Sequence, residues 1–209
     1  MTADHQTQSL TKLLSDIRAC RLCQAQLVPR PVIQASVDAR LLIIGQAPGS
    51  KVHQTGVPWD DASGKRLRQW LGISEQIFYD PHCVAIVPCA FCYPGKGTQG
   101  DLPPPVVCYE QWHTAIMASL TKVEMTLLVG RYAQARYLVR STQSNLTENV
   151  ANYSEHSMKG YWPLPHPSPR NRHWLRNNPW FEQRLLPELQ QAVRRIFSDD
   201  GISSSNNLT

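Results

Sequence analysis

Short apolar runs alternate with amphipathic stretches along this chain. Four apolar runs predict buried strands, at 41–44, 82–88, 125–129 and 161–164. Leucines and an isoleucine recur on one helical face near the N-terminus, which predicts a helix over 9–20. The same reading predicts further helices at 63–71, 108–120, 131–139, 145–156 and 180–197. We expect Pro187 to interrupt the last of these helices.

This alternation of strands and helices is typical of an α/β fold, a three-layer sandwich with a parallel sheet between helices. A length of 209 residues suits a single domain, which we expect over 1–197. The polar segment 198–209 is expected to be a disordered tail. A proline- and glycine-rich excursion occupies 93–105, between the second predicted strand and the helix at 108–120.

Two glycine- and proline-rich segments each follow a predicted strand. The first, G-Q-A-P-G at 45–49, follows the strand at 41–44, and the second, H-P-S-P-R-N at 166–171, follows the strand at 161–164. In a parallel sheet, the loops that leave the carboxyl ends of the strands converge on one crevice where ligands bind. The two segments therefore predict a shared site for a flat or phosphorylated ligand.

The charge distribution is compatible with a nucleic-acid partner. The formal net charge is +5, and basic residues are interleaved with aromatic ones over 170–181. Arginines there could neutralise phosphates while the aromatics contact bases. An equally good interpretation is a solvated basic loop whose tryptophans pack into the core. No apolar stretch is long enough to span a membrane and the polar N-terminus has no leader pattern, so we expect a cytoplasmic protein without membrane contact.

The six cysteines favour a metal, a cluster or buried thiols over a disulfide framework. Cys20 and Cys23 form a C-x-x-C pair, a spacing that can chelate one metal ion or one cluster edge. Cys92 and Cys108 are the preferred other two ligands, with Cys89 as the alternative to Cys92. Four thiolates do not distinguish zinc from an iron–sulfur cluster, and inert core thiols are a further interpretation.

From about residue 20 to 195, these motifs together resemble the uracil-DNA glycosylase superfamily, especially its iron–sulfur-containing families four and five. The first loop is similar to the G-E-A-P-G of family four, and D-A-S-G at 61–64 is similar to the D-x-S-G of family five. H-P-S-P at 166–169 matches the second motif of the superfamily. C-Y-P-G at 92–95 resembles C-R-P-P-G of the family, which favours Cys92 over Cys89. Four further positions match the Gly, Pro, Phe and Gly of family four: Gly56, Pro58, Trp59 and Gly64.

The resemblance implies a four-stranded parallel sheet between helices and excision of uracil from DNA. It also implies a structural [4Fe–4S] cluster, with zinc as the alternative occupant, on four thiolates: Cys20, Cys23, Cys92 and Cys108. Such a cluster would tie the N-terminal helix to the excursion beside the DNA-binding face. It would not carry out redox chemistry.

Cleavage of an N-glycosidic bond leaves positive charge on the sugar and negative charge on the base, after the base has left the stack. The resemblance assigns stacking on the base to Trp59, whose alternative is an ordinary core position, and stabilisation of the leaving anion to His166. Further base contacts are expected at Gly45, Ala47 and His53. Contacts to DNA are expected from the second loop, at Ser168, Arg170, Asn171 and Arg172, although the same residues would also suit a capped turn.

Two positions depart from the family pattern. Gln46 stands where family four has Glu, and an amide can orient a water but cannot take its proton. We therefore expect Asp61 to supply the catalytic carboxylate, with Asp60 as the neighbouring alternative and a helix cap as the structural role for Asp61.

The second departure concerns base recognition. An Asn that reads the uracil edge in family four is missing, and Pro88 takes its place. We expect His53, Gln54 or a backbone amide to replace it, or the substrate to carry another lesion.

The leading hypothesis is a monomeric, nucleoid-associated repair glycosylase that acts on DNA containing uracil or a related deaminated base. The alternative is a catalytically weak or inactive DNA-binding iron–sulfur protein on the same fold, because the family Glu and Asn are absent. A zinc-bearing nucleotide-binding protein fits less well, since the first loop lacks the lysine of a phosphate-binding P-loop.

Overall fold

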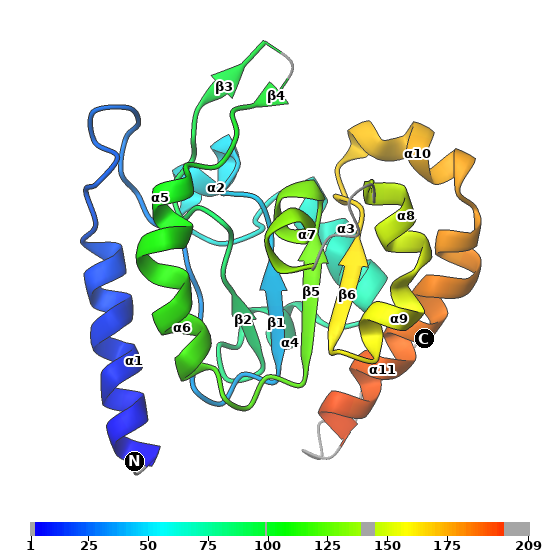
Figure 1. The fold of residues 1–209 in the computed structure, drawn as a ribbon, viewed down its shortest axis with the longest axis horizontal. Coiled ribbons are helices and arrows are strands. Elements are labelled where there is room, and N and C mark those ends of the chain that lie inside the picture. Colours follow the sequence, from blue (N-terminus) through cyan, green and yellow to red (C-terminus); the bar gives the residue numbers. More distant parts are fainter. Residues whose placement is uncertain (1–2, 99, 139–144, 199–209) are drawn as a thin grey trace.

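A parallel four-stranded sheet forms the centre of the protein, in a computed structural model that describes residues 3–98, 100–138 and 145–198. The strand order is β2-β1-β5-β6, and every neighbouring pair is parallel (Figure 1). The strands are β1 (Leu41–Ile44), β2 (Val84–Ile86), β5 (Met125–Val129) and β6 (Tyr161–Leu164). This confirms the predicted α/β sandwich, and three of the strands begin and end where the sequence predicted. β2 is shorter than the run at 82–88 because a turn occupies its first two residues.

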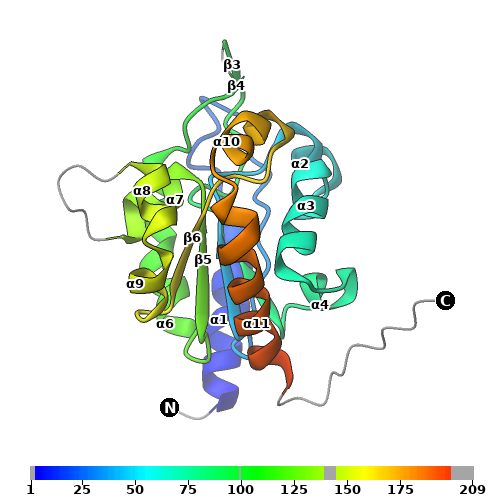
Figure 2. The ribbon, with the colours of Figure 1, turned by 90° about the vertical axis from the view of Figure 1, so that its right-hand side faces the viewer.

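Helices cover both faces of the sheet, so the strands are apolar on both sides. Leu41 and Ile43 of β1 join one core cluster, whereas Leu42 and Ile44 join the other, as the two-residue period of a strand requires. Figure 2 shows α3 (Ala62–Leu71), α4 (Glu75–Tyr79) and α11 (Leu186–Ser198) on one side of the sheet. The opposite side carries α6 (Thr114–Ser119), α7 (Arg131–Tyr137), α8 (Leu146–Ala151) and α9 (Tyr153–Ser157). The core cluster of Leu42 and Ile44 also contains apolar residues of α1 (Ala3–Arg18).

Several helices differ from the predicted ones. The helix expected at 108–120 starts two residues earlier and comprises α5 (Val106–Cys108), a π-helical turn η1 (Tyr109–His113) and α6. A second π-helical turn, η3 (Phe181–Leu185), leads directly into α11, so Pro187 lies near the start of that helix and does not interrupt it. The helix predicted at 145–156 is divided into α8 and α9 at Asn152. The tail beyond residue 198 and the last position of the helix predicted at 131–139 lie outside the described residues.

Both outer strands of the sheet have an interrupted edge. The Gly160 and Leu164 carbonyls accept bonds from the β5 side, so the intervening Pro163 peptide faces outward, where it has no N–H to donate. On the other edge, Gln34 bridges Ile86 of β2 through its backbone and donates its side-chain amide to the Val84 carbonyl at 2.8 Å.

A small antiparallel hairpin within the excursion projects beyond the carboxyl ends of the strands (Figure 1). It consists of β3 (Lys96–Gly97) and β4 (Gly100–Asp101), with Lys96 opposite Asp101. The Leu102 backbone N–H donates to the Gly95 carbonyl at 2.9 Å, which closes the base of the hairpin. The Gln46 side-chain amide donates to the Leu102 carbonyl at 3.2 Å and ties the hairpin to the loop after β1.

Candidate active site

A cavity of about 330 Å³ opens at the carboxyl edge of the sheet, where ligands of parallel α/β proteins bind. Its volume lies near the lower end of the range for small-molecule sites, about 300–1,000 Å³. The loops after β1, β2 and β6, the segment before α3 and the β3–β4 hairpin all contribute to its wall. Eight of the predicted site residues line it together: Gly45, Gln46, Ala47, Trp59, Asp61, His166, Ser168 and Arg170.

Trp59 is held in the cavity wall by two glycines. Its backbone adopts a left-handed conformation with φ of 56°, which is costly for a residue with a side chain. A Cβ on Gly64 would lie 1.8 Å from the Trp59 carbonyl oxygen, so only glycine fits beside that carbonyl. A Cβ on Gly45 would lie 3.1 Å from the indole, so the ring packs directly on the loop after β1. The indole and the His166 ring are 5.5 Å apart between centroids and inclined by 32°.

Asp61 caps a helix and also lines the cavity. One carboxylate oxygen, Oδ1, accepts the Gly64 backbone N–H at 2.8 Å and caps the N-terminus of α3. Asp61 also lines the cavity, and its Oδ2 lies 3.9 Å from a Cβ built on Gly49. The neighbouring Asp60 pairs with Lys51 at 3.6 Å and is not among the lining residues. The cap therefore fixes the Asp61 carboxylate with one oxygen toward the loop after β1.

The second loop fixes both the orientation and the protonation state of His166. The Ser168 backbone N–H donates to His166 Nδ1 at 3.2 Å, so the proton of the neutral ring is on Nε2. Burial lowers the pKa of His166, while the charges of Asp61 and Asp101 raise it in opposition. The imidazole is therefore neutral near pH 7 and presents one N–H donor. Asn171 donates its side-chain amide to the His166 carbonyl at 2.7 Å and braces the same loop.

The other predicted DNA-contacting residues of the second loop lie partly at the rim of the cavity and partly outside it. Ser168 caps the short helix η2 (Pro169–Asn171) by accepting the Arg170 N–H at 3.2 Å, and both residues line the cavity. Arg172 begins α10 (Arg172–Asn177) and is exposed outside the cavity lining. Trp174 donates its indole N–H to Thr147 at 2.8 Å and packs against the following aromatics. Within the stretch 170–181, Trp174 is thus a packing residue, while the arginines are exposed to solvent.

His53 lies on α2 (Ser50–Thr55) and is not among the residues that line the cavity. Its ring lies 5.9 Å from the Tyr93 ring, and its buried Nδ1 has no hydrogen-bond partner among the described residues. Pro88, at the position of the family Asn, does line the cavity. The wall beside Pro88 also contains Val32 and Ile86, so this side of the cavity is apolar.

The four preferred cysteines interact with one another, whereas Cys89 does not join them. Burial raises the pKa of Cys108, and together with smaller contributions from the neighbouring thiols of Cys23, Cys92 and Cys20 it brings this pKa to about 11. Burial likewise raises the pKa of Cys92, with contributions from Cys20 and Cys23. Burial also raises the pKa of Cys89, to about 12. The charged group that acts on this thiol is Arg136, and none of the four preferred cysteines contributes to the shift.

As they stand, no three or more Cys, His, Asp or Glu side chains in the described ranges are arranged to hold a metal ion. The donor set nevertheless has the chemistry of a thiolate site: four neighbouring thiols from two distant segments, Cys20 and Cys23 after α1, and Cys92 and Cys108 flanking the excursion. The thiols raise one another's pKa because their negative charges repel, and a bound cation would remove this repulsion.

Sequence reasoning missed the contribution of the hairpin. Asp101 lines the cavity and accepts the Tyr93 hydroxyl at 3.3 Å. Asp101 lies in neither an apolar period nor a short motif, and Tyr93 stands at a variable position of the C-Y-P-G segment, so neither residue gave a signal of its own. Lys51 and Ser63 also line the cavity. Ser63 belongs to the D-A-S-G motif at 61–64, whereas only closeness to the first loop could have suggested Lys51.

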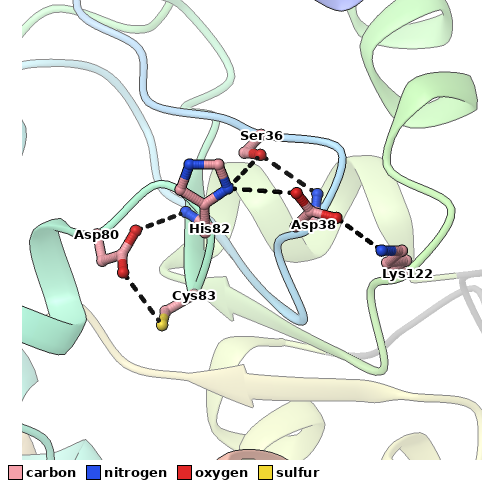
Figure 3. Close-up of polar contacts among 6 residues, drawn as sticks. All are labelled: Ser36, Asp38, Asp80, His82, Cys83 and Lys122. Carbon is pink, nitrogen blue, oxygen red and sulfur yellow. Dashed lines mark hydrogen bonds and ion pairs between the residues drawn. The ribbon is translucent and has the colours of Figure 1, made fainter. Parts of the chain in front are cut away.

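A second polar cluster lies at the opposite, amino edge of the sheet (Figure 3). We call it the amino-edge cluster: Ser36, Asp38, Asp80, His82, Cys83 and Lys122. His82 Nδ1 lies 3.1 Å from the Ser36 hydroxyl and 3.3 Å from Asp38 Oδ2, while Lys122 donates to Asp38 Oδ1 at 2.6 Å. Ser36 and Asp38 thus share a single ring nitrogen. A serine–histidine–aspartate relay needs the two nitrogens to face different partners, so this cluster does not have that geometry.

The chain matches the model of a known family over most of its length. The sequence model described as the Uracil DNA glycosylase superfamily matches residues 33–190. The matched range contains all the strands of the parallel sheet and every residue that lines the cavity except Val32. In the described part of the chain, no helix is both long and apolar enough to cross a bilayer.

Proposed function

The chain belongs to the uracil-DNA glycosylase superfamily, and from this premise we propose that it excises uracil or a related deaminated base from DNA. One observation carries the proposal: Trp59 and Asp61, which are close in sequence, line the same cavity as the distant His166 at the carboxyl edge of the sheet. A nucleobase that has left the duplex could be held there against the indole. Unstacking and unpairing the base cost a few kcal/mol.

The reaction needs a hydrogen-bond donor for the departing base. When the C1′–N bond breaks, its electron pair leaves with the base, whose carbonyl oxygens take up much of the negative charge. His166 Nε2–H can donate to such an oxygen, and the ring needs no reorganisation because the Ser168 N–H and the loop already hold it. A neutral donor suits this role, since burial has lowered the pKa of His166.

The sugar carries the complementary positive charge and must be attacked by water. Asp61 is the carboxylate that we assign to this side of the reaction, where it can stabilise the sugar cation and accept a proton from the water. Its second oxygen caps α3, so the carboxylate cannot rotate away from the cavity without loss of the cap. Arg170, on the rim, is placed to contact a phosphate next to the extruded nucleotide.

We further propose that the chain belongs to the iron–sulfur-containing branch and holds a [4Fe–4S] cluster on Cys20, Cys23, Cys92 and Cys108. The cluster would supply structural cross-linking between the segment after α1 and the excursion that carries the hairpin. Serine substitutions distinguish Cys92, a proposed ligand, from Cys89, which is not one. C92S should abolish absorbance near 400 nm and bound iron, while C89S should retain both. Metal analysis that finds stoichiometric zinc in place of iron would reject the cluster assignment.

The glycosylase proposal is tested with single-stranded and duplex oligonucleotides that contain uracil, hypoxanthine or xanthine. The wild-type protein should generate abasic sites in at least one of them. D61N keeps an oxygen for the helix cap but removes the charge, so kcat should fall by about 100-fold or more. D60N is the matched control, because Asp60 does not line the cavity and its ion pair with Lys51 is exposed to solvent. Its loss should leave kcat within about twofold.

A DNA-binding protein without catalysis is the alternative. It is favoured by the replacement of the family Glu by Gln46, whose amide is committed to the Leu102 carbonyl. Tight DNA binding without abasic sites in any of the three substrates would establish this alternative. As a glycosylase of chromosomal DNA, the protein would act as a monomer at the nucleoid.

A further inference from the structure

Asp101 is a cavity residue that neither the sequence motifs nor the family match assigns. It lies on β4, outside the loops that follow the strands of the parallel sheet, and the hairpin carries it to the cavity wall. The Gln46 amide bonds to the carbonyl of Leu102, the residue that directly follows Asp101. The hairpin therefore places a carboxylate beside the position where Gln46 has replaced the acid expected there.

Three contacts fix Asp101 in this place. The Tyr93 hydroxyl donates to its Oδ1 at 3.3 Å, and the residue pairs with Lys96 across the hairpin. The preceding Gly100 lies against the loop after β6, since a Cβ on it would be 3.2 Å from the Arg170 guanidinium. Asp101 is thus held between the loops that follow β1 and β6, the same two loops that carry the other site residues.

The position of Asp101 within the cavity indicates which part of a nucleotide it meets. Asp101 is exposed and lies next to the rim cation Arg170, whereas Val32, Ile86 and Pro88 form an apolar wall of buried or half-buried side chains. A flat base suits the apolar wall beside the indole. The sugar and its phosphates then lie toward the exposed side, where Asp101 and Arg170 are.

We propose that Asp101 is a second catalytic carboxylate, which faces the sugar of the extruded nucleotide and replaces the charge that Gln46 lacks. This inference rests on the proposed glycosylase function. As the C1′–N bond breaks, its electron pair leaves on the base and the sugar becomes cationic. The water oxygen forms the new bond to C1′, and a carboxylate accepts the proton that the water loses. Asp101 and Asp61 together supply the negative charge and the proton acceptor.

The electrostatics of the neighbouring histidine agree with this placement. Among the charged groups that act on His166, from every element around it, two carboxylates raise its pKa against the effect of burial: Asp61 before α3 and Asp101 on β4. Asp61 and Asp101 are therefore both close enough to act electrostatically on His166, the residue that we propose as donor to the leaving base. A carboxylate on the outer surface of the hairpin would not have this effect.

The decisive experiment is a charge-relocation test on uracil-containing DNA under single-turnover conditions. D101N should reduce the rate by about 10- to 100-fold, while D16N, on the exposed face of α1, should leave it unchanged. The double variant D101N/Q46E restores a carboxylate at the adjacent position and should recover at least about fivefold of the lost rate. A purely structural role for Asp101 would not be rescued in this way, so a failure of rescue overturns the proposal.

Two further measurements separate the possible outcomes. Y93F removes the hydroxyl that orients Asp101 and should cost about three- to tenfold in rate, without further loss when combined with D101N. In NMR titrations, D101N should lower the pKa of His166, and an unchanged value would overturn the proposed proximity. If the wild-type protein is active and D101N is equally active, only this inference fails. If the wild-type protein is inactive on every base, the glycosylase function fails and this inference fails with it.

Discussion

The two edges of the sheet carry similar residues in different environments. The carboxyl-edge cavity contains a histidine, aspartates and an arginine, and the amino-edge cluster contains a histidine, aspartates and a lysine. In the amino-edge cluster, the lysine, histidine and serine satisfy Asp38 and one another on the protein surface (Figure 3). In the cavity, the half-buried His166 packs against an indole, and its Nδ1 accepts the Ser168 N–H of its own loop.

This difference teaches that residue type alone does not identify a site. The hydrogen bond from Lys122 is the main cause that lowers the pKa of Asp38, which keeps this carboxylate ionised within a paired network. Burial is the main cause that lowers the pKa of His166, and the carboxylates near it oppose the shift. Desolvated groups with opposed influences in a cavity are typical of catalytic sites, whereas paired surface groups are typical of stabilising networks.

The largest expected contrast is between the two histidines. H166A should reduce the single-turnover rate of uracil excision by about 100- to 1,000-fold, because it removes the donor for the leaving base. H82A should leave the rate unchanged, since His82 is exposed at the other edge. Equal losses in the two variants would show that the carboxyl-edge cavity is not the reaction site.

The second contrast concerns the glycines that support Trp59. G64A should destabilise the fold by about 3–4 kcal/mol, because its Cβ would meet the Trp59 carbonyl at 1.8 Å and displace the indole. G49A is the matched control for stability. Gly49 has an ordinary φ of −79°, and the nearest atom to a Cβ added there would be Asp61 Oδ2, at 3.9 Å. Urea unfolding measures both, and a stable G64A variant would contradict the close approach.

A third prediction concerns the pH dependence of folding through His113, which braces the cavity wall. His113 Nε2 lies 3.1 Å from the carbonyl of Pro88, a lining residue, and burial lowers the pKa of this histidine to about 4. The unfolded chain binds this proton below about pH 6.5 and the folded chain does not. Stability is therefore complete above pH 6.5 and declines as the pH falls toward 4, by up to about 3 kcal/mol.

The measurement is the free energy of unfolding from urea titrations at a series of pH values. H113Q removes the titrating group, so its stability should depend less steeply on pH between 6.5 and 4, although the variant is less stable at pH 7. H82Q, at the amino edge, should keep the wild-type slope. An H113Q slope that equals the wild-type slope would rule out this proton linkage.

The smallest effect is expected from the amino-edge cluster. Asp38 and Lys122 expose 44% and 62% of their side chains, so water screens the ion pair between them. D38N should reduce the free energy of unfolding by less than about 1 kcal/mol, and salt should shrink the difference further. Excision of uracil should be unaffected. A large loss of either property would assign this edge a role beyond surface pairing.

The sequence predicted the parallel sheet, and eight of its predicted site residues line the cavity, for a clear physical reason. Strands buried on both faces are continuous apolar runs, and the loops at their carboxyl ends must converge. The short helices α2, α4 and α10 were not predicted, because tertiary contacts stabilise them more than their own periodicity does. Asp101 could not be predicted, since its place depends on how an irregular excursion folds back onto Gln46.

His53 shows what sequence proximity leaves undetermined. It lies close to the first loop in the chain, yet α2 directs it toward Tyr93 and outside the cavity lining. Asn171 was expected at a phosphate, and its amide instead bonds to the His166 carbonyl. In both cases the residue lies on a short helix, α2 or η2, whose geometry sets the direction of the side chain. A short sequence motif does not specify that direction.

The interrupted edges of the sheet affect how this protein behaves at high concentration. Open strand edges recruit strands from other molecules and start aggregation. Here the outward peptide of Pro163 cannot donate, and Gln34 already occupies the outer side of β2. A strand of a neighbouring copy would therefore find no continuous row of donors and acceptors to extend along β2 or β6.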